Sequence, residues 1–433
     1  MLLLKNARVV DYISGLDGEK DILINAGEII SISENITENA ERIIDCKGLT
    51  AIPGLFDMHV HARDPGGLHK EDLLTCSEAA AAGGVTGFLC MPNTVPVIDN
   101  EETLNYLAEK AKTCKVKIYS SCAITKGQEG KEICDIGRLK KAANGNFCIA
   151  MTDDGRPVKS ARVMGEAMIK AGDEKVLMIS HCEDMDIAGG GLINAGIVSI
   201  KLGLWGLHRS SENIITSREI SLARDLREKV HIAHVSTKEA VAEIRSAKAQ
   251  GVGVTCEAAP HHYTLTEDKL YEKDADYRMN PPLRLRADID AIIEGLRDGT
   301  IDCIATDHAP HTPDEKYYFH TAPNGVIGLE TSLAVTLTFL VHTGKLSMFD
   351  IVRLMCVNPR KILGIFGIKG ENGGSIAIGH TADITLFDPY EEWTVDTAQF
   401  KSKSRNSCFK GMKLKGRVKH TIVNGNVVYS FAP

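Results

Sequence analysis

The chain has 433 residues, which is more than one ordinary hydrophobic core holds and suits a barrel of roughly 250–400 residues with a small second domain. Hydrophobic residues make up 43% and charged residues 25%, as in an average globular protein. The net charge of -7 argues against nucleic acid or an anionic membrane surface as a partner. A protein of this charge that binds a small anion must concentrate positive charge locally, in metal ions and arginines.

The cysteines and the N-terminus indicate the compartment. Twelve cysteines are scattered, mostly in apolar segments, without the spacing of a zinc finger or a redox motif, and we expect buried free thiols. Lys5 follows Met1–Leu4 too soon for a signal peptide, and the longest apolar stretch, Ser332–Val341, is too short to span a bilayer. These features predict a soluble, cytoplasmic protein.

Both ends of the chain are rich in short predicted strands separated by glycine-containing turns. Asn424-Gly425 is typical of a hairpin turn. We expect residues 1–52 and 371–433 to pair into one small β-sandwich domain. The predicted strands are Leu2–Val10, Asp21–Asn25, Glu28–Ile32, Arg42–Asp45, Gly374–Ile378, Asp383–Asp388, Glu392–Val395 and Gly416–Tyr429.

The middle of the chain, residues 53–370, alternates predicted strands with predicted helices. Eight such strands indicate a (β/α)8 TIM-type barrel, which places its chemistry at the carboxyl ends of the strands. A doubly wound open sheet is the alternative, but it would require a glycine-rich turn after the first strand, where His-x-His-x-Arg stands. The strands are Leu55–His61, Val85–Met91, Val116–Ala123, Phe147–Met151, Val176–His181, His231–Val235, Gly253–Glu257 and Ile301–Thr306. The helices are Glu71–Ala82, Glu101–Lys112, Ser160–Ala171, Ser211–Arg227, Thr237–Ala249, Ala287–Arg297, Glu330–His342 and Met348–Cys356.

The first barrel strand carries the strongest chemical signal. Side chains alternate along a strand, so Asp57, His59, His61 and Arg63 share one face. Two imidazoles on one face of a strand end, between a carboxylate and a guanidinium, suit a divalent metal. A pair of packed, hydrogen-bonded histidines is the alternative.

Four other strand ends also carry metal-binding side chains. We select His234 over His231 because it lies nearer the carboxyl end of its strand. In the predicted dinuclear site His59 and His61 hold one metal, His181 and His234 hold the other, and a carboxylate bridges the two cations. The strand ends are Thr152-Asp153-Asp154-Gly155, His181-Cys182-Glu183-Asp184, His231-Ile232-Ala233-His234 and Asp307-His308-Ala309-Pro310-His311.

With these residues in place, the chain resembles the bacterial type I dihydroorotases of the amidohydrolase superfamily, from the first strands to about Leu386. This resemblance implies a zinc-dependent barrel with two Zn2+ per subunit, flanked by a small β-sandwich from both termini. It is carried by Pro53–Gly66, Met91-Pro92-Asn93-Thr94, His181-Cys182-Glu183-Asp184, His234-Val235-Ser236-Thr237, Met279-Asn280-Pro281-Pro282-Leu283-Arg284 and Asp307-His308-Ala309-Pro310-His311.

The resemblance also implies roles for the carboxylates. Many relatives bridge their metals with a carboxylated lysine from the fourth strand, but Phe147–Met151 contains no lysine. Similarity to the type I enzymes offers Asp154 as the bridge, with Asp153 as the alternative. Asp307 is implied as a metal ligand and as the general base and acid, which takes a proton from a metal-bridging hydroxide and passes it to the ring nitrogen.

On the substrate side, the family acts on dihydroorotate and N-carbamoyl-L-aspartate, so carboxylates must be bound. Arg63 stands one step above the metal ligands and suits bidentate carboxylate binding. By resemblance, Asn93 and His311 complete this pocket, and Asn280 addresses the ring amide edge. The resemblance further implies substrate contacts from His61 and from the backbone near Gly325 and Val326.

The expected activity is the reversible cyclisation of N-carbamoyl-L-aspartate to dihydroorotate in pyrimidine (UMP) biosynthesis. Allantoinase, dihydropyrimidinase-like hydrolases and a non-catalytic scaffold are the alternatives. We expect a homodimer that can associate with other enzymes of the pathway, and a lid formed by residues 311–324. His261, His262 and His308 are interpreted as packing or supporting residues, and no cysteine stands beside a pair that would activate it as a nucleophile.

Overall fold

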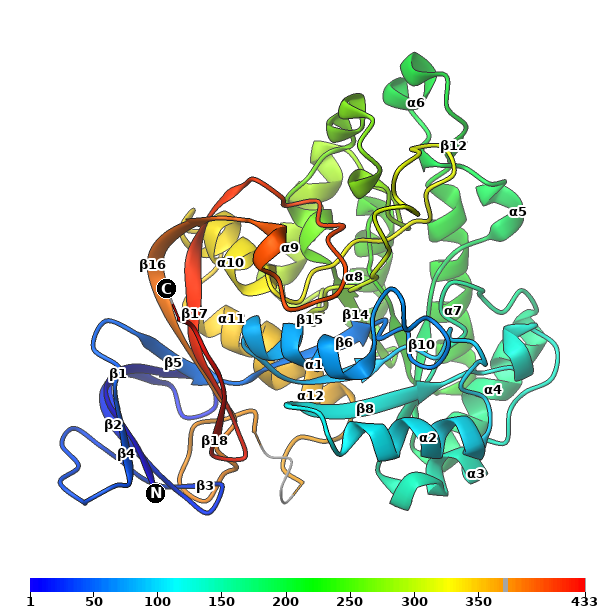
Figure 1. Ribbon diagram of the computed structural model, residues 1–433. Helices are drawn as coiled ribbons and strands as arrows, with labels where there is room; N and C mark the ends of the chain where they lie inside the picture. The colour runs from blue at the N-terminus through cyan, green and yellow to red at the C-terminus, as the bar shows by residue number, and fades with distance from the viewer. Residues whose placement is uncertain (369–372, 433) are drawn as a thin grey trace.

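A closed barrel of parallel strands forms the centre of the molecule in the computed structural model, which describes residues 1–368 and 373–432 (Figure 1). Neighbouring strands pair in the order in which they occur in the chain, and all of these pairs are parallel. A parallel bridge between Val60 and His308 joins the first strand to the segment after the last, which closes the barrel. The strands are β6 (Leu55–Val60), β7 (Val85–Cys90), β8 (Lys117–Cys122), β9 (Cys148–Met151), β10 (Leu177–Ser180), β13 (Val230–Ile232), β14 (Val254–Ala258) and β15 (Cys303–Ile304).

Helices cover the outside of this barrel, and polar side chains cap several of them. Asp72 accepts a hydrogen bond from the backbone N–H of Thr75 at 2.8 Å, and Asn100 and Thr237 cap their helices in the same way. The helices are α1 (Leu73–Ala82), α2 (Glu101–Ala111), α3 (Ile136–Lys141), α4 (Ala161–Glu174), α7 (Ser210–Leu226), α8 (Lys238–Ala249), α9 (Arg286–Asp298), α10 (Ser332–Thr336), α11 (Met348–Val352) and α12 (Asn358–Ile362). Single π-turns, Leu337–Val341 and Arg353–Val357, continue α10 and α11.

The barrel has a closed end and a polar end. Its interior is an apolar cluster with Phe56, Met58 and Leu89, and Leu363 and Ile365 join that cluster from the end of α12. The opposite end, where the strands finish, carries the histidines and aspartates described below. The predicted (β/α)8 architecture is therefore confirmed, and each predicted barrel strand and helix has a counterpart.

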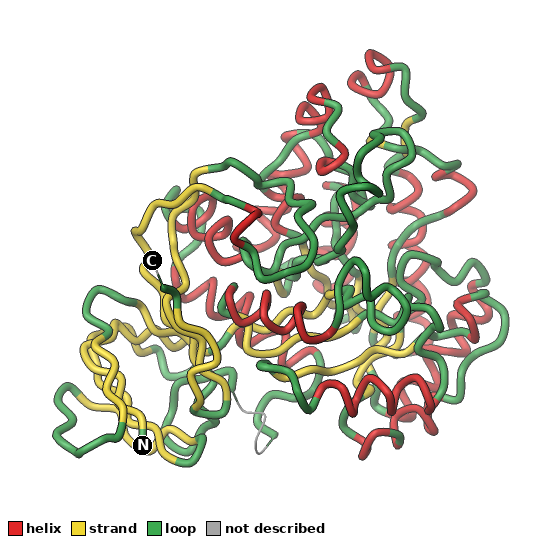
Figure 2. The backbone as a smooth tube through the Cα atoms, in the orientation of Figure 1, coloured by secondary structure: helices red, strands yellow, loops and turns green. Residues whose placement is uncertain are grey.

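Strands from both termini form a second, mixed sheet, as predicted (Figure 2). β1 pairs antiparallel with β2 and parallel with β4 and β5, while β16 pairs with β5 and β17. The prediction lacks β5, and the predicted strand Gly374–Ile378 is wrong: these residues form turns and irregular backbone, and Ile376 packs into the core of this sheet. The strands are β1 (Leu2–Asp11), β2 (Leu16–Asn25), β3 (Glu28–Ser33), β4 (Arg42–Asp45), β5 (Thr50–Pro53), β16 (Ile384–Thr394), β17 (Lys413–Val423) and β18 (Asn426–Ser430).

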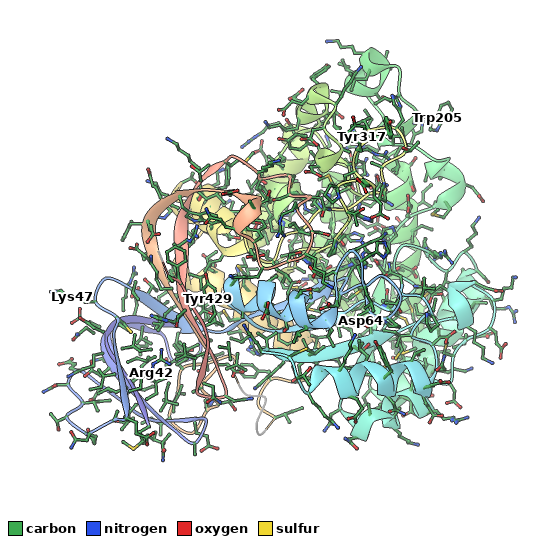
Figure 3. All side chains as sticks on the ribbon, in the orientation of Figure 1. Arg42, Lys47, Asp64, Trp205, Tyr317 and Tyr429 are labelled. Atoms are coloured by element: carbon green, nitrogen blue, oxygen red, sulfur yellow. The ribbon has the colours of Figure 1, made fainter. Side chains whose placement is uncertain are left out.

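A small lobe between β10 and α7 was not predicted either. It contains α5 (Met185–Ala188), β11 (Ile193–Asn194), α6 (Ile197–Leu202) and β12 (Gly206–Leu207), and Trp205 at its edge is 66% exposed (Figure 3). No helix among the described residues is long and apolar enough to cross a membrane. The predicted boundary between residues 370 and 371 lies outside the described residues.

Candidate metal and substrate site

The first part of the site joins β6 to the segment after β15. His59 and His61 lie on the same face at the end of β6, and their Nε2 atoms lie 3.5 Å and 3.1 Å from Oδ1 of Asp307. The same two nitrogens lie 3.4 Å from the two carboxylate oxygens of Asp154. All four side chains are buried, so their charges interact with little screening by solvent.

The second part brings in β10 and β13. Nδ1 of His181 lies 2.9 Å from Nε2 of His234, and both nitrogens face Oδ1 of Asp154, at 3.5 Å and 3.8 Å. Asp154 therefore stands between the two pairs of histidines. Its neighbour Asp153 points away and accepts hydrogen bonds from the backbone and hydroxyl of Thr125.

Two buried atoms at the centre of this cluster have no hydrogen-bond partner in the described part of the chain: Nε2 of His59 and Oδ1 of Asp154. Buried polar atoms are nearly always paired, because an unpaired one costs about 1–3 kcal/mol. A divalent cation would satisfy both, and imidazole nitrogens with carboxylate oxygens are the donors that zinc binds. The residues present therefore fit a metal.

The electrostatics agree with this donor set. Burial alone would raise the pKa of Asp154, but the charge of His59 and the nearby ring nitrogens of His181 and His234 outweigh it and hold the pKa well below its usual range. Burial is likewise outweighed at Asp307, where the hydrogen bond from His61 is the largest favourable contribution and keeps the pKa low. Both carboxylates are thus held ionised, as metal ligands and general bases require.

A second layer of side chains orients the histidines. Nδ1 of His59 donates to Glu257 on β14 at 2.7 Å, and the other oxygen of Glu257 lies 3.2 Å from Nε2 of His231. Such a carboxylate fixes the ring so that its other nitrogen faces the metal. Sequence reasoning missed Glu257, although it stands at a strand end like the ligands. Asn93 and Glu183 do the same for His61 and His181, at 2.8 Å and 3.0 Å.

Three non-glycine residues of the site have positive φ: Arg63 at 58°, His234 at 33° and Asp307 at 50°. This backbone region is disfavoured for residues that have a Cβ, and such residues concentrate at functional sites, where the surrounding structure maintains them. The strain supports a functional interpretation of these three strand ends.

A cavity of about 270 Å³ opens beside the cluster. Predicted ligands and predicted substrate residues both contribute to its wall, whereas His59 and Val326 do not. Gly325 lines it, but its N–H donates to Arg278 and its carbonyl accepts from Lys316 and Asn406. The lining residues are His61, Arg63, Asn93, Asp154, Gly155, His181, His234, Asn280, Asp307, Ala309, His311, Asn324 and Gly325.

Arg63 provides the positive charge of this cavity. Its Nε donates to the carbonyl of Pro310 at 3.1 Å, and its Nη2 lies 3.4 Å from Nε2 of His311. Within residues 1–368 and 373–432, no carboxylate forms an ion pair with Arg63. Burial, followed by the charge of Arg63, lowers the pKa of His311 to about 3. A partly buried guanidinium beside a neutral imidazole is a site for an anion.

The histidines that were set aside lie outside the cavity wall. The two ring nitrogens of His231 form hydrogen bonds with the hydroxyl of Thr255 and the carboxylate of Glu257. His262 donates to the carbonyl of Pro281 at 2.9 Å. Nδ1 of His308 accepts from the backbone of Gly328 at 3.2 Å. These contacts tie neighbouring segments together and leave the metal-facing positions to the predicted set.

A barrel with histidines and aspartates gathered at its strand ends is typical of metal-dependent hydrolases. The family comparisons agree with this class. Residues 48–240 match the family described as "Dihydro-orotase-like", and residues 213–429 match the amidohydrolase family.

Curated relatives narrow the class. A dihydroorotase of Acetivibrio thermocellus is 46% identical over 429 residues, covering 99% of this chain and 98% of the relative. A dihydroorotase of Clostridioides difficile is 45% identical over 432 residues, covering 99% and 100%. The chain belongs to the dihydroorotase family.

Among solved structures, an L-hydantoinase from Arthrobacter aurescens has a TM-score of 0.87 at 27% identity, covering 100% of this chain and 96% of that one. A dihydropyrimidinase from Brevibacillus agri, at 22% identity and a TM-score of 0.86, covers 99% and 95% and shows the fold alone.

Proposed function

We propose that this protein is a zinc-dependent dihydroorotase, which catalyses the reversible cyclisation of N-carbamoyl-L-aspartate to (S)-dihydroorotate and water in pyrimidine biosynthesis. The observation that carries the proposal is the partly buried guanidinium of Arg63, without a carboxylate partner in the described chain, in the cavity that the His/Asp cluster also lines. Hydantoin and dihydropyrimidine rings lack the carboxylate that this position would bind.

Six residues would hold two zinc ions: His59, His61, Asp154, His181, His234 and Asp307. Asp154 is the proposed bridge, since its carboxylate faces both pairs of histidines. When bound, zinc supplies Lewis acidity, which lowers the pKa of water and polarises a carbonyl oxygen. β9 offers no lysine for a carboxylated bridge, which separates this site from the lysine-bridged cyclic amidases.

The carboxylate of the substrate would bind to Arg63 and His311, which face each other across the loop after β15. Nδ2 of Asn280 donates to Glu183 at 2.9 Å, so its carbonyl oxygen is left to accept from the ring amide edge. Asn93 also lines the cavity, and its amide holds His61 and Asp154. Asn93 would therefore serve the ligand side and the substrate side at once.

Asp307 would handle the proton. Its low pKa keeps it ionised and ready to accept a proton from the attacking water. The same carboxylic acid would then protonate the leaving ring nitrogen, and in the direction of synthesis the order reverses. The positive φ of Asp307 supports a position set by this task rather than by local backbone preference.

The test is a side-by-side assay of metal-loaded protein on dihydroorotate, allantoin and dihydrouracil, with metal analysis of the same sample. We expect turnover of dihydroorotate and about two zinc ions per chain. Preferred turnover of allantoin or dihydrouracil would assign the protein to another cyclic amidase. Loss of all three activities in fully loaded protein would favour a scaffold.

Other features remain proposals. The twelve cysteines are free, which supports a reducing, cytoplasmic location. We also propose domains at 1–52, 53–370 and 371–433, a homodimer that can associate with other pyrimidine enzymes, and a lid at residues 311–324. Tyr317, which Figure 3 labels, and its neighbour Tyr318 are both exposed. Light scattering of the purified protein tests the homodimer.

A further inference from the structure

A segment from the terminal sheet reaches the mouth of the barrel. The chain between β16 and β17 leaves the sheet and runs toward the barrel (Figure 1). We call residues 401–407 the mouth strap. The backbone of Lys401 and Ser402 donates to Glu330, the hydroxyl of Ser402 donates to Glu71, and that of Ser404 donates to the carbonyl of Lys70 at 2.9 Å.

Asn406, near the end of the mouth strap, is buried, and within the described chain its side-chain hydrogen bonds all go to the loop after β15. Its Nδ2 donates to the carbonyls of Ala309 at 3.0 Å and Gly325 at 3.1 Å, and its Oδ1 accepts from the N–H of His311 at 3.1 Å. Its own carbonyl accepts from Ile327 at 2.9 Å. The amide thus has both donors and an acceptor occupied, which gives it one orientation.

These contacts surround the residues that would bind the substrate's carboxylate. Ala309 and His311 flank Pro310, whose carbonyl accepts from Nε of Arg63 at 3.1 Å. Asn406 therefore holds the backbone on both sides of the group that orients Arg63. Asn406 also holds the backbone N–H of His311. The side chain of His311 is held separately, because its Nε2 donates to the carbonyl of Asn324 at 2.9 Å.

The cavity wall is closely packed around Gly325. A Cβ on Gly325 would lie 2.6 Å from Cβ of Ala309 and 3.3 Å from Nε2 of His311. The φ of Gly325, 125°, is also open only to glycine. The carbonyl of Gly325 receives a second donor, Nζ of Lys316, at 2.9 Å. Because the loop segments that contain Ala309 and Gly325 are in contact, a small displacement of either segment moves the anion-binding groups.

We propose that Asn406 is a positioning residue that sets affinity for the substrate's carboxylate by holding the loop on which Arg63 and His311 depend. The inference rests on the proposed function. Asn406 touches neither the cavity nor the His/Asp cluster, so it acts on substrate binding and leaves the chemical step alone.

Asn406→Asp tests this inference, because it keeps the acceptor for His311 and replaces the two donors by an oxygen that repels the carbonyls of Ala309 and Gly325. We expect KM for dihydroorotate to rise about tenfold or more while kcat stays within about threefold, since lost hydrogen bonds of this kind change affinity by such factors. Metal content should not change. Asn406→Ser, which retains one donor, should give an intermediate KM.

Ser407→Ala is the matched control. Ser407 is buried in the same strap, but its hydroxyl accepts from the backbone of Phe409 and does not contact the wall. It should lower the melting temperature without changing KM. The inference would be overturned if both Asn406 variants kept the wild-type KM, or if Ser407→Ala raised KM as much as they do. A fall in kcat at constant KM in the Asn406 variants would overturn it as well. Should Asn406→Asp not fold, Asn406→Ser against Ser407→Ala decides by the same criterion.

The wild-type assay separates this inference from the function on which it rests. Wild-type protein that fails to hydrolyse dihydroorotate overturns both proposals. Wild-type activity with an unchanged KM in the Asn406 variants overturns only the role of Asn406.

Discussion

The two sides of the cavity are built in different ways. The metal side consists of side chains at the ends of β6, β10 and β13 and of segments that directly follow β9 and β15, so the barrel itself places them. The substrate side consists of Arg63, His311 and Gly325, which lie on loops and are held by hydrogen bonds from distant segments. Rigid strands thus supply the chemistry, and loops that need support supply the recognition. Substitutions on the two sides should therefore have different kinetic signatures.

Asp307→Asn on the metal side should have the largest effect. The amide cannot accept the proton, so we expect kcat to fall about 10³-fold, within the range of general-base catalysis. Metal content, measured on the same preparation, should stay close to that of wild type because His59, His61 and Asp154 remain. Loss of metal with unchanged turnover per metal would contradict the proton-transfer role.

Arg63→Met should weaken substrate binding without affecting the metal side. Charge-assisted hydrogen bonds to a carboxylate contribute about 1.5–3 kcal/mol, so we expect KM for dihydroorotate to rise about 10- to 100-fold, with a smaller change in kcat. Arg63→Lys, which keeps the charge but not the planar fork, should recover part of the affinity. A fall in kcat at constant KM would place Arg63 on the chemical side instead.

Glu257→Gln tests whether the side chains that orient the metal-binding histidines affect zinc affinity. The amide cannot accept from both His59 and His231, so the orientation of His59 should loosen, and zinc affinity should fall about 10- to 100-fold. Competition with a chelator measures this directly. Glu219→Gln is the control, since the hydrogen bonds of this buried carboxylate in the described part of the chain go to Ser180 and Arg218 rather than to a histidine. An equal loss of affinity in both variants would reject the role of Glu257.

His311 should give the smallest effect, visible in stability. Burial and the charge of Arg63 lower its pKa to about 3, against 6.5 for an ordinary histidine. Between these values the unfolded chain binds a proton that the folded chain does not, so this residue makes stability fall as the pH drops from 6.5 toward 3. His311→Asn should flatten the fall in urea midpoint between about pH 7 and pH 5.5. The exposed His320→Asn should not; an equal flattening would contradict the assignment.

The sequence indicated where the His/Asp cluster gathers more clearly than what supports the substrate side, for a physical reason. His59 and His61 are two residues apart on one strand, and parallel strands bring their carboxyl ends to one rim, so local pattern and topology locate the ligands. Glu257 was missed because a single glutamate at a strand end has no distinguishing spacing. Asn406 was missed because its partners lie 81 to 97 residues away.

The outcome for the fold follows the same division. Short apolar runs and helical periodicity predicted the barrel strands and their helices, since both are local properties of the chain. Gly374–Ile378 has the composition of a strand but forms turns, because Ile376 enters the core of the terminal sheet and its N–H donates to Asp11 at 3.1 Å. Here a tertiary contact outweighed local preference.

By itself, the sequence determined the barrel, the terminal sheet and the donor types at the strand ends, because period and chemistry are written along the chain. Only the tertiary structure decided that Asp154 rather than Asp153 faces the histidines, that Arg63 lacks a carboxylate partner among the described residues, and that Asn406 supports the loop beside it. These outcomes depend on which side chains come into contact after the chain has closed into a barrel. Contacts between residues far apart in the sequence have no local sequence pattern.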